Sequence, residues 1–248
     1  MSVFHFKKFD VRNDRSAMKV NTDGVLLGIC APMQPSDRQI LDIGTGTGTA
    51  ALVLAQRMSG AAMEDGAGFT GIDAMITGID IDEDAAAEAG ENFRESPWSG
   101  ILTALHTPLS EYEPDSGFDL IVSNPPYYDD SLINPDARKA TARHTGGGLS
   151  YREILAFAET RLNTGGRLCI ILPADQEREL LRYGRMHGLH PSNILRIKTV
   201  QRKAPSRIIV AFKAGEKPVP IEDSLTIMEK GSYTQQYLSL VKDFYLFA

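Results

Sequence analysis

Short apolar runs alternate along this chain with segments in which apolar residues recur every three or four positions. The short runs predict strands, and the helical spacing predicts helices. The expected strands cover residues 39–43, 77–81, 102–106, 118–123, 167–172, 194–200 and 207–213. The expected helices cover residues 49–57, 84–94, 151–161 and 176–187, with Asp82 or Asp84 as the N-cap of the second helix.

This alternation predicts an α/β fold with a mostly parallel sheet and helices on both of its faces. The last two expected strands are joined by a short connection, which predicts an antiparallel hairpin at the sheet edge. We expect a single domain over residues 1–248, with residues 1–35 as an N-terminal cap. Residues 59–76 contain four glycines and little periodicity, which predicts a mobile insertion.

The composition excludes several classes of protein. Hydrophobic residues make up 42% of the 248 residues, so the chain can bury a sizeable core and is not largely disordered. It contains no apolar run long enough for a membrane span, and its first residues contain no secretory h-region. Cys30 and Cys169 are too few for a structural zinc site or a disulfide scaffold, so we expect no metal and a cytoplasmic location.

Charge is distributed unevenly along the chain. The net charge is −6, but residues 131–248 alone carry 18 basic and 11 acidic side chains. Residues 178–207 contain eight basic side chains and one acid. Such a block can neutralise the phosphates of a nucleic acid. A solvated surface on a helix and a hairpin is the alternative interpretation.

The first candidate site is a glycine-rich turn between an expected strand and an expected helix. Asp42 precedes the turn, and Asp80 ends the next strand, where an acid can accept hydrogen bonds from ribose hydroxyls. A pyrophosphate would be repelled by Asp42, whereas the ammonium group of S-adenosylmethionine would be attracted. The turn therefore resembles motif I of class I S-adenosylmethionine methyltransferases and favours that cofactor over NAD. The expected cofactor contacts are Asp42, Gly44, Thr45, Gly46, Gly48, Asp80 and Ile81.

The second candidate site is Asn124-Pro125-Pro126-Tyr127, directly after a strong strand. In an open α/β sheet, ligands bind at this end of the strands. The Asn124 side-chain oxygen and the Pro125 backbone oxygen could each accept one N–H of an aromatic amine, and the two prolines would keep these acceptors rigid. Tyr127 offers a face on which a base can stack. Asn124 would also touch the cofactor.

This tetrapeptide resembles motif IV of several amino-methyltransferases. They include adenine-N6 enzymes that act on DNA or RNA, guanine-N2 enzymes that act on ribosomal RNA, and glutamine-N5 enzymes that act on release factors. The motif therefore predicts a planar amine or amide as the methyl acceptor. A binding module that senses the cofactor without catalysis would tolerate the loss of Asn124, yet the motif is intact.

Further stretches distributed over nearly the whole chain resemble the bacterial tRNA adenine-N6 methyltransferases that act on adenosine 37 of a valine tRNA. They lie at residues 6–9, 17–28, 96–98, 124–128, 207–212 and 244–247. The resemblance implies a Rossmann-like class I methyltransferase fold, S-adenosylmethionine as cofactor and a tRNA substrate. It also implies that Lys19, Thr22 and Asp23 lie over the cofactor pocket, although Thr22 and Asp23 fit a simple turn before a helix equally well.

One position departs from that family. Leu109 occupies the position of the acid expected after the third strand and is therefore the remaining expected cofactor contact; Ser110, Glu111 or a backbone amide could take the place of the acid beside the cofactor adenine. On the acceptor side, a tRNA would be held by basic residues, and solvated loop charge is the alternative. The expected RNA contacts are Arg138, Lys139, Arg143, Arg178, Arg182, Arg202, Lys203 and Arg207. We expect a monomer.

Overall fold

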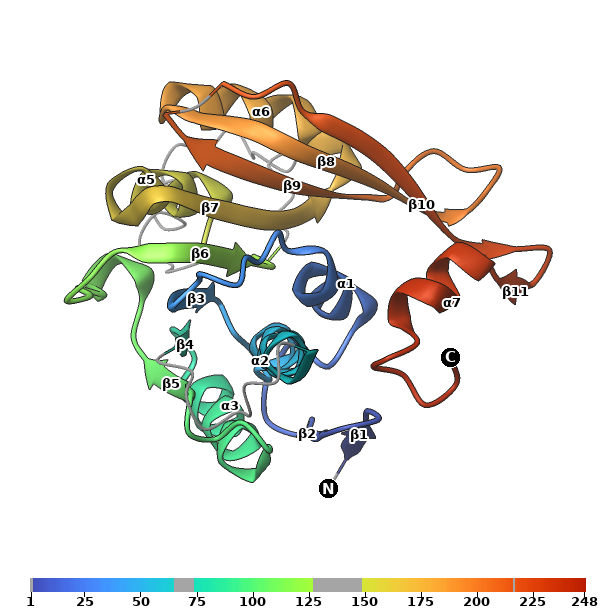
Figure 1. The fold of residues 1–248 in the computed structure, drawn as a ribbon, viewed down its shortest axis with the longest axis horizontal. Helices are drawn as coiled ribbons and strands as arrows, with labels where there is room; N and C mark the ends of the chain where they lie inside the picture. Colours follow the sequence, from blue (N-terminus) through green and yellow to red (C-terminus); the bar gives the residue numbers. More distant parts are fainter. Residues whose placement is uncertain (1, 65–73, 127–148, 216) are drawn as a thin grey trace, which may run out of the picture.

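The computed structural model describes residues 2–64, 74–126, 149–215 and 217–248 (Figure 1). Within these ranges, a nine-stranded sheet has the order β11-β10-β8-β9-β7-β6-β3-β4-β5. Its strands are β3 (Gln39–Ile43), β4 (Met75–Asp80), β5 (Leu102–His106), β6 (Phe118–Ser123), β7 (Leu162–Pro173), β8 (Leu189–Val200), β9 (Arg207–Ala214), β10 (Ile221–Glu229) and β11 (Ser232–Tyr233). A separate antiparallel pair consists of β1 (Val3–His5) and β2 (Asp10–Arg12).

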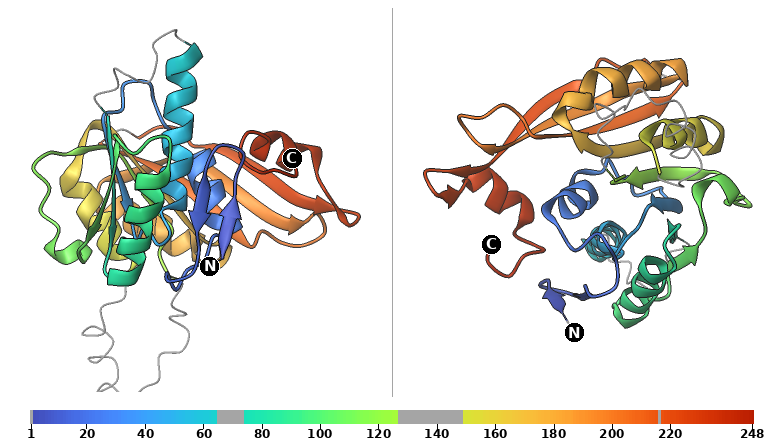
Figure 2. Two further views of the ribbon diagram at one scale, coloured as in Figure 1. Left: turned by 90° about the horizontal axis from the view of Figure 1, so that it is seen from below. Right: turned by 180° about the vertical axis from the view of Figure 1, so that it is seen from behind.

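The helices cover both faces of the sheet, as Figures 1 and 2 show. Their bounds are α1 (Thr22–Cys30), α2 (Thr49–Glu64), α3 (Glu83–Glu95), α5 (Tyr151–Arg161), α6 (Glu177–Met186) and α7 (Gln235–Val241). Alternate strand residues face opposite sides. In β3, Ile40 packs in the core beneath α1, α2 and α3, whereas Leu41 packs in the core beneath α5 and α6. The predicted layered α/β fold is therefore confirmed.

Three details differ from the predictions. The hairpin of β8 and β9 is antiparallel as predicted, but it lies inside the sheet, because β10 pairs in parallel with β8 and β11 follows β10 at the edge. The predicted insertion at residues 59–76 overlaps α2, which continues to Glu64, while residues 65–73 lie outside the described residues. The strand expected at residues 167–172 begins earlier, because β7 already starts at Leu162 and includes Gly165 and Gly166.

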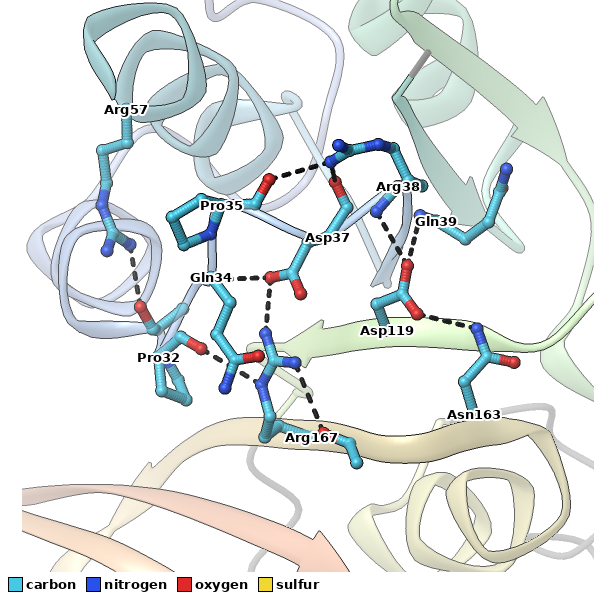
Figure 3. Close-up of polar contacts among 12 residues, drawn as sticks. Pro32, Gln34, Pro35, Asp37, Arg38, Gln39, Arg57, Asp119, Asn163 and Arg167 are labelled. Atoms are coloured by element: carbon cyan, nitrogen blue, oxygen red, sulfur yellow. Dashed lines mark hydrogen bonds and ion pairs between the residues drawn. The ribbon is translucent and has the colours of Figure 1, made fainter. Parts of the chain in front are cut away.

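One ion pair and several hydrogen bonds join the segments around the amino ends of β3 and β6 (Figure 3). Arg167 and Asp37 are both buried and form an ion pair at 2.5 Å. On β6, Asp119 accepts hydrogen bonds from the backbone N–H of Arg38 and from the side chain of Asn163. This network lies at the amino ends of the strands. The candidate site lies at the opposite ends of these strands, where β3 and β6 end.

The ribbon of β1 and β2 packs against the C-terminal segment. Phe6 forms an isolated antiparallel bridge with Tyr245, and their rings stack with centroids 5.6 Å apart. The Lys7 Nζ donates hydrogen bonds to the backbone oxygens of Lys242 and Ala248, at 2.6 and 2.7 Å. Segments from the two ends of the sequence therefore share one small interface.

Candidate active site

A pocket opens at the carboxyl ends of β3 and β6. It is lined by residues of the glycine-rich turn, by the segment that leads into α1, and by the residue that follows β6. The lining residues are Met18, Lys19, Val20, Asn21, Gly24, Asp42, Gly44, Thr45, Gly46, Thr47, Thr49, Ala50 and Asn124. The structure thus brings both sequence-predicted sites, the glycine turn and Asn124, to one cavity.

The glycine turn needs its glycines for two physical reasons. Gly44, Gly46 and Gly48 have φ values of 70°, 56° and 81°, a left-handed conformation that other residues rarely adopt. In addition, a Cβ on Gly48 would lie 2.4 Å from a ring carbon of Phe93. The turn can therefore fold tightly between β3 and α2 and expose its backbone to a ligand.

Asp42 is the most buried acid of the pocket, with 2% of its surface exposed. Its Oδ2 accepts a hydrogen bond from the Thr45 hydroxyl at 2.8 Å. Burial raises the pKa of Asp42 to about 7, against a smaller lowering by Thr45. Among the described residues, no cationic side chain forms an ion pair with this carboxyl. A cationic group on a ligand would therefore find a buried, uncompensated acid here.

Asp80 supports the same turn from the end of β4. Its Oδ2 accepts a hydrogen bond from the Gly46 N–H at 2.9 Å, and its Oδ1 accepts one from the Asp82 N–H at 3.0 Å. Burial raises the pKa of Asp80 as well. Each carboxylate oxygen can accept more than one hydrogen bond, so both retain capacity for hydroxyl donors.

Several expected cofactor contacts are not part of the pocket lining; they include Gly48, Asp80, Ile81 and Leu109. Ile81 is exposed directly after β4, and its backbone oxygen lies 3.0 Å from the His106 Nε2. Leu109 is half-buried and packs against the core beneath α5 and α6. Its side chain is therefore occupied by apolar contacts.

The segment before α1 forms a pocket wall that the resemblance only partly located. Lys19 lines the pocket, while its Nζ donates to the backbone oxygen of Asp14 at 2.6 Å. Asn21, which the sequence reasoning missed, caps α1 by accepting the Gly24 N–H at 2.9 Å. Thr22 begins α1 and does not line the pocket.

Asp23 does not turn to the pocket but to β9. Its Oδ2 accepts a hydrogen bond from the Arg207 Nε at 2.8 Å. One residue predicted to bind the cofactor and one predicted to bind RNA are thus paired with each other. The ion pair fastens the start of α1 to the start of β9.

Two buried side chains of α3, also missed, hold this wall in place. Glu88 accepts hydrogen bonds from the backbone N–H groups of Asp14, Arg15 and Ser16, at 2.7 to 2.9 Å. Asn92 donates to the Thr47 backbone oxygen at 2.9 Å and accepts from the Arg12 N–H at 2.8 Å. The sequence signal was an acid and an amide on the otherwise apolar stripe of α3.

Asn124 lies at the mouth of the pocket and is 9% exposed. Its side-chain amide contacts the Met18 sulfur at 3.5 Å. The Ser123 hydroxyl donates to the Ile43 backbone oxygen at 2.7 Å, which joins the ends of β6 and β3. Pro125 is buried and Pro126 is half-buried, whereas Tyr127 lies outside the described residues.

The predicted RNA-binding residues differ in whether they form ion pairs with acids of this chain. Arg178 is exposed near the start of α6, and Arg202 and Lys203 are exposed in the turn between β8 and β9. Arg182 pairs with Glu179 at 2.8 Å, as Arg207 does with Asp23. The remaining three predicted contacts, Arg138, Lys139 and Arg143, lie outside the described residues.

Within the described part of the chain, no group of three or more His, Cys, Asp or Glu side chains is placed to hold a metal ion. No helix in the same ranges is long and apolar enough to cross a membrane.

Comparison with known proteins identifies the family of this chain. Residues 16–183 match the model of the family described as methyltransferase small domain. The chain belongs to this family. The class predicted from the two motifs, an S-adenosylmethionine-dependent methyltransferase, is therefore confirmed.

Relatives of this methyltransferase match it over nearly its full length. A tRNA1(Val) (adenine(37)-N6)-methyltransferase of Parabacteroides distasonis is 39% identical, over 98% of this chain and 97% of that protein. A protein of the same name from Pedobacter heparinus is 37% identical, over 99% of this chain and 98% of that protein. The family resemblance found in the sequence is confirmed by these matches.

Solved structures confirm the fold of the methyltransferase. A predicted O-methyltransferase from Agrobacterium tumefaciens superposes with a TM-score of 0.66 at 17% identity, over 90% of this chain and 96% of that chain. The 16S rRNA N2 G1207 methyltransferase of T. Thermophilus, solved with AdoMet and guanosine, gives a TM-score of 0.55 at 17% identity, over 86% of this chain and 50% of that one. At this level of identity the similarity shows the Rossmann-like fold alone.

Proposed function

We propose that this methyltransferase transfers the methyl group of S-adenosylmethionine to N6 of adenosine 37 in tRNA1(Val). The observation that carries the proposal is the convergence of Asn124 and the glycine turn in one pocket. Full-length relatives named for this activity support the choice of substrate.

The residues around Asp42 fit the cofactor. The buried carboxylate of Asp42 would hold the ammonium group, and the exposed backbone of Gly44 and Gly46 would allow a close approach. Asp80, beside the turn, would accept hydrogen bonds from the ribose hydroxyls. When bound, S-adenosylmethionine supplies an electrophilic methyl group.

Asn124 and Pro125 would activate the adenine amine. The lone pair of that nitrogen is delocalised into the ring, which makes it a poor nucleophile. Two acceptors that each bind one N–H draw the nitrogen toward tetrahedral geometry and localise the lone pair. Because Pro125 is buried and Asn124 nearly so, these acceptors are held in place before the substrate arrives. The methylated product is acidic enough to lose its proton to water, and no strong base is required.

Exposed basic residues would bind the tRNA backbone. Arg178 is exposed near the start of α6, and Arg202 and Lys203 are exposed in the turn after β8, which points in the same direction as the carboxyl ends of β3 and β6. Arg182 and Arg207 already pair with acids, so their contribution to phosphate binding would be smaller. This division revises the RNA contacts expected from charge alone.

Methyl transfer to unmodified tRNA, followed by nucleoside analysis, tests the proposal. We expect labelled N6-methyladenosine from the wild-type protein. Asn124→Ala should lower kcat about 100-fold or more, because it removes one acceptor of the reacting amine. Its affinity for S-adenosylhomocysteine should change less than about threefold.

The exposed Asn193, on β8 and away from the pocket, provides a matched control. Asn193→Ala should retain wild-type kcat. Near-full activity of Asn124→Ala would refute the role of Asn124. Label that appears in protein instead of tRNA would favour a glutamine methyltransferase.

A further inference from the structure

The strands on the C-terminal side of the sheet extend well beyond the pocket. The row of paired residues through Ser123, just before Asn124, continues across β7 and β9 to Ile194 on β8. Val200, the last residue of β8, is six residues farther along the strand. At about 3.3 Å per residue, the end of β8 projects roughly 20 Å past the row that carries the catalytic motif.

Two turns meet at this projecting end. Val200 pairs in parallel with Met228 of β10, so the turn after β8 lies beside the turn after β10. The first turn carries Arg202 and Lys203, and the second carries Lys230. All three side chains belong to exposed residues, and none forms an ion pair with a described acidic residue. Adjacent strands therefore present three cations within a small area.

The backbone at Lys230 does not explain why lysine is there. Lys230 and Gly231 form the two-residue turn of the hairpin between β10 and β11, and their φ values are 49° and 85°. Such turns favour Asn, Asp or Gly at the first position, and lysine is strained in this conformation. Strained residues cluster at functional sites. Lysine differs from Asn by supplying a positive charge at this position.

Stacked aromatic rings lie next to these cations. Tyr233 pairs with Met228 one strand away, and it is 43% exposed. Its ring stacks on Phe247, which is 53% exposed, with centroids 5.1 Å apart and an angle of 17° between the planes. Exposed aromatic faces beside cations are the usual means of binding unpaired nucleotides.

We propose that Arg202, Lys203, Lys230, Tyr233 and Phe247, here called the strand-end patch, form an RNA-binding surface separate from the catalytic pocket. This proposal rests on the proposed function and extends it. The patch binds the same tRNA outside the loop that carries the reacting adenosine, because it lies too far from Asn124 to touch that loop's target base. Its cations bind phosphates, and its stacked rings bind a base.

The test removes charge from the strand-end patch without disturbing its turns. The variant R202A/K203A/K230N combines two exposed truncations with Asn, which suits the backbone at position 230 better than lysine does. Lys217→Ala is the matched control, since Lys217 is also exposed but precedes β10 at the opposite end of that strand. Each protein is titrated with a full-length unmodified tRNA transcript and with a short hairpin that contains only the target loop.

We expect the triple variant to bind the full-length tRNA more than tenfold more weakly than wild type at about 0.15 M salt, because three phosphate contacts are lost. The slope of log affinity against log salt should decrease in magnitude by about 2. Binding to the short hairpin and to S-adenosylhomocysteine should change less than about twofold. Tyr233→Ala should also weaken binding of the full-length tRNA only.

Equal affinity and an equal salt slope for wild type and triple variant would overturn the proposal. So would an equal loss in Lys217→Ala, or an equal loss on the short hairpin. Nucleoside analysis of the wild-type product separates the two claims. If wild type makes no N6-methyladenosine while the triple variant still loses tRNA affinity, the proposed function fails and the strand-end patch stands. If wild type makes it and the triple variant binds normally, only the patch fails.

Discussion

Replacing Asp42 with asparagine is expected to stabilise the cofactor-free protein while weakening its affinity for the cofactor. Burial at the end of β3 raises the pKa of Asp42 from its ordinary value of 3.8 to about 7. The hydrogen bond from Thr45 offsets part of this effect, and the neighbouring charge of Asp80 adds to it. An ionised Asp42 is therefore costly in the folded protein until a cation lies beside it.

The magnitude follows from the two pKa values. They differ by about three, and each pKa unit corresponds to about 1.4 kcal/mol, so ionisation of Asp42 costs about 4 kcal/mol. The folded chain binds more protons than the unfolded chain between about pH 4 and pH 7, and its free energy of unfolding falls as the pH rises through that interval. Asparagine is neutral throughout. The free energy of unfolding of Asp42→Asn should therefore exceed that of wild type by an amount that grows from near zero at about pH 4 to about 4 kcal/mol above pH 7.

Urea unfolding of both proteins between about pH 5 and pH 8 measures this difference. Asp115→Asn, at an exposed position, serves as the control and should shift the free energy of unfolding by less than about 0.5 kcal/mol. In calorimetry, the affinity of wild type for S-adenosylhomocysteine should fall about tenfold for each pH unit below pH 7. The affinity of Asp42→Asn should be weaker and should not change with pH. The reasoning is refuted if wild type is the more stable protein at about pH 8.

Two further substitutions test the packing around the site and at the opposite edge of the sheet. Gly48→Ala should lower the free energy of unfolding by about 2–4 kcal/mol, because position 48 has a positive φ and a Cβ there would collide with Phe93. Gly60→Ala on α2 is the control and should be neutral or stabilising, because a Cβ there would have nothing within 4 Å. Equal effects of the two substitutions in urea unfolding would contradict this reasoning. Arg167→Met should lower the free energy of unfolding by about 3–5 kcal/mol, because it leaves Asp37 buried without its partner. The double variant R167M/D37L should recover most of that loss in thermal unfolding. A loss below about 1 kcal/mol in Arg167→Met would contradict this prediction.

Most strands of the fold could be predicted because their apolar residues are buried on both faces. In β6 and in residues 166–172 of β7, nearly every position is buried, and the apolar run marks the strand directly. β10 has no such run, since its first four residues are exposed and Leu225 is its one buried residue. Its strand conformation depends on pairing with β8, a long-range contact that local patterns do not encode. The edge of the sheet was therefore assigned to the wrong hairpin.

The candidate site was predictable where it depends on strand ends. Asp42 lies at the end of β3 and Asn124 directly follows β6, and parallel strands bring their carboxyl ends together. The pairing of Asp23 with Arg207 was not predictable, because these residues are 184 positions apart and each has a plausible ligand role of its own. Glu88 could have been noticed as an acid on the buried stripe of α3, but its three backbone partners appear only in the structure.

The contact between the β1–β2 ribbon and the C-terminal segment has a consequence for how the protein opens. Lys7 and Phe6 are held by backbone and ring partners in residues 242–248, and those residues are held by the ribbon in return. Each segment loses these shared contacts once the other detaches. The amide protons at this interface should exchange with solvent at similar rates, and a protease cut in either segment should loosen both, while Glu88 and Asn92 keep the pocket wall in place.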